Sequence, residues 1–254
     1  MNGAFYIGAT GLRAQERALG VAANNIANMN TPGFKRSQIR FSELMSAQPA
    51  SDGLSRAPFG RASGVAALEA SPVFEQGELR ATGSAFDIAV EGDGFIEVLG
   101  PEGQSLLWRG GTLSVSADGL LATADGLPLR ALITVPEGVS ELRIGRDGTV
   151  SGLVAGDAVA TELGRIDLMA VRDLASLESL SGGLYRAGSA DAASVMVPGE
   201  DGAGTIVQGA IEASNVALSN EMVTLMLMQR AYAASAQALQ AGDQLMGIAN
   251  GLRR

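Results

Sequence analysis

The 254-residue chain contains no histidine and no cysteine. Without cysteine there can be no disulfide, no zinc ribbon and no thiol nucleophile. Without histidine there can be no Ser-His-Asp triad, no histidine general base and no two-histidine metal site. The side chains left for chemistry are carboxylates, hydroxyls, arginines and a single lysine, Lys35. We therefore expect neither a metal nor a cofactor, and an enzyme is the less favoured class.

Long apolar runs are also missing, and positive charge is scarce. No apolar run approaches the roughly 20 residues that a membrane-spanning helix needs. The formal net charge of −9 argues against a general nucleic-acid binder. The first residues lack the basic region and the unbroken apolar stretch of a secretory signal. We therefore expect no membrane insertion and no cleaved signal peptide, which leaves the cytoplasm or export by another route.

Charge and periodicity divide the chain into two ends and a centre. With +3 on residues 1–46 and no net charge on 211–254, the centre, 47–210, carries −12. At both ends large apolar residues recur every seven positions, mostly with smaller residues three positions further on. This heptad pattern predicts long coiled-coil helices over about 2–28 and 220–250. The predicted subunit-packing residues are Phe5, Leu12, Leu19 and Ile26 at the N-terminal end and Leu225, Tyr232, Leu239 and Met246 at the C-terminal end.

The heptads allow two interpretations. The two helices of one chain can pack on each other as an internal hairpin, which is the commonest use of such a stripe. Alternatively, the stripes continue into neighbouring subunits. The many alanines on both helices favour the second interpretation, because small side chains permit close approach on more than one face. A single helix of this length is marginal in water, so a packing partner is needed in either case.

Between the helices the sequence predicts β-structure. Short apolar runs alternate with turn dipeptides such as Asp93-Gly94 and Asp118-Gly119, a spacing typical of hairpins in a meander or small barrel. The candidate strands are Phe86–Val90, Phe95–Leu99, Thr112–Val115, Leu120–Thr123, Leu129–Val135, Glu141–Ile144 and Gly164–Val171. We expect an α+β fold, in which long N- and C-terminal coiled-coil helices flank a mainly antiparallel β domain. The expected divisions are an N-terminal core helix (1–30), a loop or linker region (31–70), a β-rich outer domain (71–205) and a C-terminal core helix with its lead-in (206–254).

Two groups of charged residues could carry chemistry. Acidic pairs such as Asp93 with Glu97 could act as general acid and base, as glycosidases require. Most of these carboxylates adjoin glycine in turn dipeptides, where Asp favours turn conformations, so the turn interpretation is preferred. Lys35, Arg36 and Arg40 form a small basic patch. This patch could bind an acidic partner, but a solvated loop is the preferred interpretation.

Four segments of the sequence resemble the bacterial flagellar rod and hook family. The first, ANNIANMNTPGFKR (23–36), is similar to the N-terminal signature of that family. FDIAVEGDGFIEV (86–98) and IGRDGTVSG (144–152) are similar to segments of its β domain, and GAIEASNVALSNEMVTLMLMQRAY (209–232) is similar to its C-terminal motif. In combination these segments are highly specific. The residues at matching signature positions are Asn24, Asn25, Ala27, Asn28, Thr31, Gly33, Phe34 and Lys35.

The resemblance implies a structural subunit that self-assembles into the helical tube of the flagellar rod, transmits torque to the hook and passes exported subunits. In that family the terminal helices line the inner core and the β domain lies outside. The implied partners are other copies of the chain, neighbouring rod and hook proteins, the bushing ring proteins around the rod and the flagellar type III export apparatus. The implied location is the basal body, spanning the periplasm and reached without a cleaved signal peptide.

The sequence leaves the position in the rod and two rival classes of protein open. The TGLRAQ start and the IGRDG and QRAY segments favour the distal rod, whereas the short stretch 47–64 favours its proximal paralogue. A cell-wall-directed glycan-binding protein or carboxylate-based enzyme is a rival class, although it gives no reason for heptads at both termini. Another secreted fibre subunit would share the helices but lack the signature.

Overall fold

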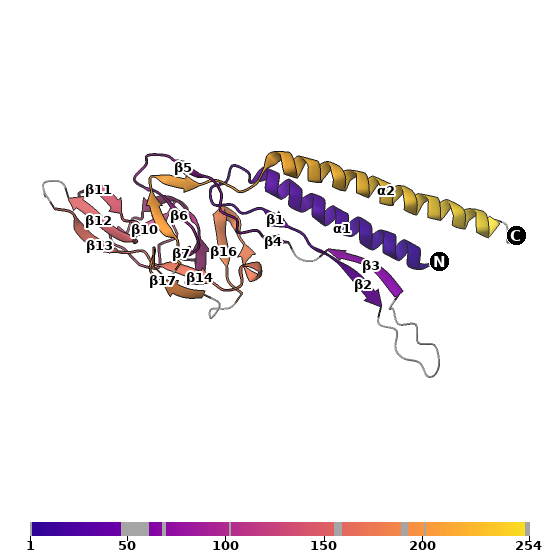
Figure 1. Cartoon of the computed structure of the whole chain (residues 1–254), viewed down its shortest axis with the longest axis horizontal. Helices are drawn as coiled ribbons and strands as arrows, with labels where there is room; N and C mark the ends of the chain where they lie inside the picture. Colours follow the sequence, from indigo (N-terminus) through magenta and orange to yellow (C-terminus); the bar gives the residue numbers. More distant parts are fainter. Residues whose placement is uncertain are drawn as a thin grey trace, which may run out of the picture. The chain divides into compact units, whose positions relative to one another are not determined.

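The computed structural model describes residues 2–46, 61–67, 70–101, 103–154, 159–188, 193–200 and 202–251. Two long helices form the ends of the chain, α1 (Asn2–Ala27) and α2 (Leu218–Gly251), and antiparallel strands lie between them in sequence (Figure 1). The fold is therefore α+β with mainly antiparallel sheets, as predicted, and each helix ends close to its expected limits. Over the residues described, neither helix is long and apolar enough to cross a bilayer.

The chain divides into two compact units. The helix unit contains Met1–Ala27, Ser37–Ala70 and Ala217–Arg254. The β unit contains Asn28–Arg36 and Ser71–Val216. The chain thus passes from the helix unit to the β unit and back twice. The region 31–70, expected to be one loop or linker, is therefore shared between the two units.

Helices α1 and α2 lie side by side in the helix unit (Figure 1). Gly8 of α1 permits a close approach, because a Cβ there would come within 2.5 Å of Leu239 Cδ2 in α2. Further along, Gln15 Nε2 donates a hydrogen bond to Ser235 Oγ at 3.2 Å. The missing side chain at Gly8 and this polar contact together define how the two helices meet within one chain.

Strands β2 (Phe41–Ser46) and β3 (Arg61–Ala67) form an antiparallel hairpin in the helix unit. Strand β3 packs on α1, since a Cβ at Gly64 would lie 2.2 Å from Thr10 Oγ1. The sequence analysis expected no strand in this region. The residues of β3 are mostly Ala, Ser and Gly, which weaken the alternation of large apolar and polar residues that predicts a strand. Residues 47–60 of the expected linker lie outside the described part of the chain.

The remaining strands are short, and all the pairs within the β unit are antiparallel. The bounds of the strands and of two 3₁₀ turns are β1 (Ser37–Gln38), β4 (Ser71–Pro72), β5 (Leu79–Ala81), β6 (Asp87–Glu91), β7 (Phe95–Leu99), β8 (Ser105–Trp108), β9 (Gly110–Val115), β10 (Leu121–Thr123), β11 (Val139–Ile144), β12 (Thr149–Val154), β13 (Thr161–Arg165), β14 (Leu168–Val171), η1 (Leu174–Ser176), β15 (Glu178–Ser179), η2 (Ser181–Gly183), β16 (Leu184–Arg186), β17 (Ala193–Met196), β18 (Thr205–Gln208) and β19 (Ala210–Glu212).

In the described part of the β unit, these strands form three larger sheets and one pair. The six-stranded sheet has the order β15-β16-β8-β7-β14-β17, and the four-stranded sheet has the order β10-β9-β6-β18. A three-stranded sheet, β11-β12-β13, and the pair β19-β5 complete the unit. The pair matters for the site described below, because β19 ends at Glu212 and leads into α2.

Alternating residues of the strands build two hydrophobic clusters. Ile88 of β6 and Ile96 of β7 lie in the main cluster, and both are essentially fully buried. Because successive side chains of a strand point to opposite faces, Phe95 of β7 belongs to the other cluster. There its ring meets those of Phe74 and Tyr185 edge-on, at centroid distances of 5.4 and 6.0 Å. The second cluster lies beside the ionic site of the β unit.

Two of the predicted strands differ from the structure. The run Gly164–Val171 is split into β13 and β14, and at the break Arg165 Nε lies 3.2 Å from Asp167 Oδ1. The run Leu129–Val135 makes only isolated bridges and a turn in which Leu132 has a φ of +46°. Its apolar residues reach the core from a turn, and an apolar run alone does not distinguish that from a strand.

Candidate functional site

The most deeply buried side chains of α1 are small. Ala14, Ala18 and Ala22 recur every four residues and are 3%, 7% and 2% exposed. Small side chains at a contact allow neighbouring elements to approach a helix closely. The predicted packing residues of α1 lie beside this stripe. Three of them are half-buried, namely Leu12, Leu19 and Ile26, and the side chain of Phe5 lies outside the described residues.

The inner face of α2 is the face directed at α1. Leu225 and Leu239, two of the predicted packing residues, are half-buried on it. Tyr232 is 40% exposed, and the side chain of Met246 lies outside the described residues. The contact of Leu239 with Gly8 shows that helix pairing occurs within one chain. Contact of the same residues with neighbouring copies stays a prediction.

A second apolar face of α2, which we call the outer α2 face, consists of Met222, Val223, Met226 and Leu227. Helical spacing turns Val223, Met226 and Leu227 away from Leu225, and Met222 lies at the border of the two faces. They are 50%, 54%, 50% and 57% exposed. Contiguous exposed apolar residues mark interaction surfaces. The seven-residue periodicity did not single out this face, because its members are one and four positions apart.

Asn25 of the signature holds the end of α1 to the chain twelve residues further on. Its side chain is almost fully buried. Asn25 Nδ2 donates to Ser37 O at 2.9 Å, and Asn25 Oδ1 accepts from Ser37 N at 2.8 Å. Only an amide side chain offers both a donor and an acceptor in this arrangement. The signature position is therefore explained by a two-way hydrogen bond within the helix unit.

We expect Asn25→Asp to destabilise the helix unit. The carboxylate keeps the acceptor for Ser37 N but loses the donor for Ser37 O and buries a charge, which costs about 1–3 kcal/mol. Thermal unfolding followed by the helical circular dichroism signal measures this loss. A variant with the same change at exposed Asn220 of the same unit serves as the matched control, and equal stability of the two variants would contradict the assignment.

The chain leaves α1 through a tight turn. Thr31 Oγ1 donates to Asn28 Oδ1 at 3.2 Å, and Thr31 N donates to Asn28 O at 3.1 Å. Gly33 follows with a φ of +68°, a left-handed conformation that favours glycine. Phe34 is buried in the β unit. The remaining signature residues are exposed on α1, namely Asn24 and Ala27.

Lys35, the single lysine of the chain, is buried and not solvated. Its Nζ lies 2.5 Å from Glu212 Oε1 and donates to Glu75 O at 2.8 Å. The prediction of a solvated basic patch is therefore wrong for Lys35, although Arg36 is partly exposed and Arg40 is exposed. Burial lowers the pKa of the Lys35 ammonium, and the neighbouring carboxylate opposes that shift.

Glu212 is the centre of a buried ion cluster, which consists of Lys35, Arg109 and Glu212. Glu212 Oε2 lies 3.2 Å from Arg109 Nε, and the Arg109 and Glu212 side chains are 6% and 1% exposed. Arg109 also donates to Gly94 O at 2.7 Å and to Val90 O at 3.4 Å. One carboxylate thus faces two cations. Removing it would leave two buried positive charges without a counter-ion, which is strongly destabilising.

Tyr185 connects the signature turn to the ion cluster. Its hydroxyl accepts a hydrogen bond from Lys35 N and donates one to Gly33 O, both at 3.1 Å. Burial raises the pKa of the Tyr185 hydroxyl, so the group stays a neutral donor.

We expect Tyr185→Phe to lower the free energy of unfolding of the β unit by about 1–2 kcal/mol, since both bonds are lost. Denaturant unfolding measures this effect, and an unchanged midpoint would contradict it.

Asn215 holds a further pair of segments together. Its Oδ1 accepts from Arg36 N at 2.7 Å. Its Nδ2 donates to Val73 O at 2.9 Å and to Glu75 O at 3.0 Å. All three of its hydrogen-bond partners are backbone groups. Residues 36, 73–75 and 215 are therefore fixed to one another next to the ion cluster.

No sequence pattern predicts a role for Arg109, Tyr185, Glu212 or Asn215. Their contacts join residues up to 179 positions apart, and no local sequence pattern predicts such a pairing. Two signals were available in retrospect. The chain's single lysine stands next to an apolar signature, and Glu212 and Asn215 lie within the segment that resembles the C-terminal motif. A lone cation among apolar residues is a reason to look for a buried counter-ion.

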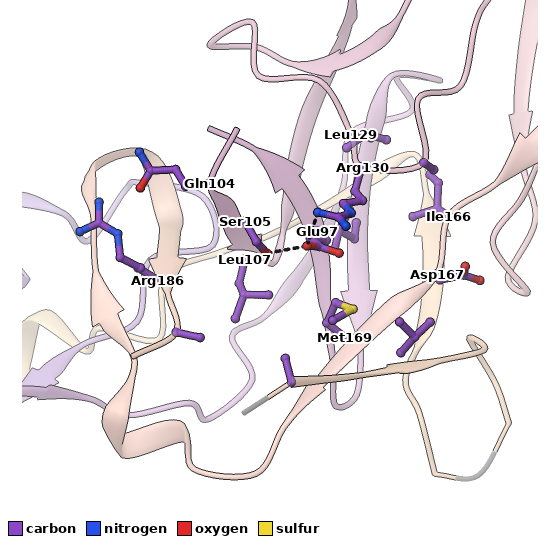
Figure 2. Close-up of a pocket in the computed structure, with 15 residues that line it drawn as sticks. Glu97, Gln104, Ser105, Leu107, Leu129, Arg130, Ile166, Asp167, Met169 and Arg186 are labelled. Atoms are coloured by element: carbon purple, nitrogen blue, oxygen red, sulfur yellow. Dashed lines mark hydrogen bonds and ion pairs between the residues drawn. The ribbon is translucent and has the colours of Figure 1, made fainter. Parts of the chain in front are cut away.

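Glu97, one of the carboxylates proposed for acid and base chemistry, is engaged by neighbouring side chains. A groove of about 700 Å³ lies on one face of the six-stranded sheet, and Figure 2 shows Glu97 within it. Ser105 Oγ donates to Glu97 Oε1 at 2.5 Å, and Arg130 Nη1 lies 3.5 Å from the same oxygen. Asp167, also in the groove, is paired with Arg165. The groove therefore presents paired carboxylates and not a free acid and base.

The acidic turn residues behave as the turn interpretation predicts. Asp147 accepts hydrogen bonds from Thr149 N at 3.2 Å and Thr149 Oγ1 at 2.7 Å, which close a local turn. These bonds lower the pKa of the Asp147 carboxyl. Gly148 follows with a φ of +81°. The side chain is used to shape the backbone.

Three family models match the chain. The model of the flagella basal body rod protein matches residues 5–35, that of the flagellar hook protein FlgE/F/G D1 domain matches 89–152, and that of the flagellar basal body rod FlgEFG protein C-terminal region matches 207–252. The flagellar basal-body rod protein FlgG of Borreliella burgdorferi is 32% identical over 264 residues, covering 99% of this chain and 98% of that protein. The chain belongs to the flagellar basal-body rod family.

Other members of the rod family are equally similar. FlgG of Caulobacter vibrioides is 32% identical, with 96% of this chain and 97% of that protein covered. FlgF of the same organism is 32% identical, with 94% of this chain and 93% of that protein covered. The chain is thus a structural subunit of the flagellar basal-body rod, which assembles with other rod and hook components. The alternatives of a cell-wall enzyme and of an unrelated fibre subunit are set aside.

The three matched regions of this rod subunit meet in the ion cluster. Lys35 lies in the N-terminal region, Arg109 in the D1 region and Glu212 in the C-terminal region. The family resemblance is distributed over the chain, but its parts are joined at one point of the β unit. The signature residues after α1 therefore help to hold the three matched regions together within the β unit.

Proposed function

We propose that this rod subunit polymerises through its helix unit into a helical tube and that it occupies the distal rod. The observation that carries the proposal is the outer α2 face, a row of large apolar side chains that α1 leaves exposed. Coiled-coil contacts between neighbouring copies would cover this face. The α1–α2 pair of one chain is then the repeating element, and the outer α2 face is the surface through which pairs associate.

Burial of the outer α2 face supplies a driving force for association. A fully buried Met, Leu or Val side chain contributes roughly 1.5–3 kcal/mol. The members of this face are half-exposed, so each gains roughly 1 kcal/mol on complete burial. Met226 and Leu227 are the members of this face farthest from the start of α2 at Leu218. Because every subunit of a polymer would bury the same face, this modest free-energy gain per side chain would be sufficient for polymerisation.

The exposed side of α1 is a suitable partner for the outer α2 face of another copy. Around Gly11 and Gly20 no described atom lies within 4 Å of the position that a Cβ would occupy. Ala9 and Ala23 are also exposed. Large side chains of one helix pack into the holes between small residues of another. This arrangement accounts for the alanine and glycine content of α1 better than an isolated pair does.

The β unit is proposed to face outward in the assembled rod. The centre of the chain carries a net charge of −12, whereas the N-terminal end is slightly basic and the C-terminal end is neutral. Like charges keep unassembled subunits soluble and resist crowding of β units at the axis. The proposed neighbours are other rod and hook proteins, the bushing ring proteins and, before assembly, the flagellar type III export apparatus. The rod would span the periplasm, transmit torque and pass exported subunits.

The proposed position is the distal rod, with the proximal rod as the second candidate. Support for the distal position comes from the FlgG relatives, one of which covers 99% of the chain, and support for the proximal position comes from FlgF of Caulobacter vibrioides. An epitope inserted into the β unit at the exposed Asp125-Gly126 turn, with immunogold labelling of isolated basal bodies, separates the two. Label next to the hook supports the distal position, and label confined to the inner end of the rod contradicts it.

A further inference from the structure

The segments that connect the two units are tied to one another inside the β unit. The chain passes between the units at 27/28, 36/37, 70/71 and 216/217. The adjoining stretches of the β unit are 28–36, 71–77 and 209–216, which we call the crossing segments. Each crossing segment is bound to the other two by side chains described above. Every path of the chain between the units therefore runs through one small region.

Glu212 makes several of these bonds. Its backbone carbonyl accepts from Gly33 N at 2.8 Å. Its carboxylate accepts from Gly77 N at 2.8 Å, in addition to Lys35 and Arg109. One residue of the third crossing segment thus binds the first through two groups and the second through one. Arg109 anchors the carboxylate to Val90 of strand β6 and to Gly94, which directly precedes strand β7.

We propose that Glu212, with Lys35 and Arg109, is the positioning lock of the subunit, which holds the three crossing segments in one fixed arrangement and is required for the helices to assemble. The proposal rests on the proposed function, because assembly is the activity that the lock serves. Glu212 is a positioning residue in this account, since it acts through the segments that it binds and does not itself contact a neighbouring copy.

The lock can form only when all three regions of the chain are present and folded, because each region supplies one of its charged residues. Lys35, Arg109 and Glu212 come from the three separate matched regions of the rod family. Two cations without the carboxylate cannot stay buried at low cost. A chain whose C-terminal segment is missing or not yet folded therefore leaves residues 28–36 undocked. The lock thus makes assembly competence depend on the folding of all three regions.

The lock is separable from the hydrophobic core of the β unit. Most members of the main cluster, such as Ile88 and Ile96, come from the strands, and none of them belongs to the crossing segments or to the ion cluster. Loss of the lock is therefore expected to release the crossing segments before the sheets unfold. That expectation gives the proposal a readout that a general loss of stability does not produce.

The test compares full-length variants at a temperature well below their unfolding transitions. In Glu212→Gln the amide cannot accept from Lys35, Arg109 and Gly77 together, because its NH₂ group is a donor facing donors. We expect hydrogen exchange in peptides 28–36 and 71–77 to rise about tenfold to a hundredfold. We expect polymer yield, measured by sedimentation and electron microscopy, to fall about tenfold or more. Lys35→Met should behave likewise, and Lys35→Arg, which keeps the charge, should recover most of the yield.

Asp87→Asn is the stability-matched control. Asp87 is a buried carboxylate of the same unit that accepts from Thr82 Oγ1 at 2.6 Å and Thr112 Oγ1 at 2.7 Å, outside the ion cluster. It should lower the unfolding midpoint while protection of segments 28–36 and 71–77 and polymer yield stay at the level of the unaltered chain. Equal loss of polymer in Asp87→Asn and Glu212→Gln, at similar midpoints, would overturn the lock, as would normal polymerisation of Glu212→Gln.

Failure of the proposed function has a different signature. If the unaltered chain forms no polymer under any condition tested, self-assembly through the helix unit is wrong, whatever the variants do. The lock is then judged on exchange in the monomer alone. Faster exchange at 28–36 and 71–77 in Glu212→Gln, but not in Asp87→Asn, upholds it, and unchanged exchange overturns it.

Discussion

The double variant Met226→Asp/Leu227→Asp should remain monomeric at concentrations at least about a hundredfold above those at which the unaltered chain polymerises, because two carboxylates would have to be buried without counter-ions. Both side chains are exposed in the single chain, at 50% and 57%. The substitution leaves the half-buried residues of the inner face, Leu225 and Leu239, in place. Helical content and the unfolding transition should stay close to those of the unaltered chain. Sedimentation velocity and circular dichroism on the same samples measure both properties.

A matched control adds the same two charges elsewhere. Val159 and Val115 of the β unit are 76% and 43% exposed apolar residues, and Val159→Asp/Val115→Asp should polymerise as the unaltered chain does. Polymerisation of Met226→Asp/Leu227→Asp at the normal concentration would remove the outer α2 face from the account. Leu225→Asp is a less informative variant, because Leu225 is half-buried on the face directed at α1.

Gly77→Ala should destabilise the β unit by about 3 kcal/mol and lower its thermal midpoint by roughly 10 °C. A Cβ at this position would lie 1.9 Å from Ala213 O, a backbone atom that side-chain rotation cannot move away. Relief of the clash requires segments 71–77 and 209–216 to separate, which also breaks the bond from Gly77 N to Glu212. The change disturbs the lock without altering any charge. Thermal unfolding of the full chain measures the shift.

Gly188→Ala is the control for this substitution. The nearest atom to a Cβ there is Ser176 O at 3.8 Å, an ordinary contact distance. Its midpoint should stay within about 2 °C of the unaltered chain, since a surface substitution is usually within 0.5 kcal/mol. If Gly77→Ala unfolds at the same temperature as Gly188→Ala, the crossing segments are not held as closely as the structure indicates.

The parts of the fold that sequence reasoning recovered are those specified by local patterns. The heptads predicted both terminal helices, and the short apolar run Phe95–Leu99 between turn dipeptides predicted strand β7 with the same limits. Turn dipeptides located most of the β unit because Asp-Gly pairs have local conformational preferences. Strand β3 was not predicted, because its small residues form a strand by packing on α1 and show no strand-like sequence pattern. Leu129–Val135 shows the reverse error, a strand-like run that forms a turn.

The candidate site was recovered in part for the same reason. The signature identified Asn25 and Gly33, whose roles are a hydrogen-bonded contact near the helix end and a left-handed turn. The burial of Lys35 could not be derived, because its counter-ion is 177 positions away and its neighbours in sequence do not report it. The outer α2 face was hidden for another reason. Its residues belong to a helix that is apolar on two sides, and a search for one stripe finds only one side.

The measurement that tests the central claim most directly uses the absence of cysteine from the chain. In Leu227→Cys the new thiol lies on the outer α2 face, and in Val159→Cys it lies on the exposed surface of the β unit. A maleimide reagent should label both variants at similar rates as monomers. In the polymer, labelling of Leu227→Cys should slow at least about tenfold, because neighbouring copies cover the outer α2 face, and labelling of Val159→Cys should be unchanged. Equally fast labelling of Leu227→Cys in the polymer would contradict assembly through that face.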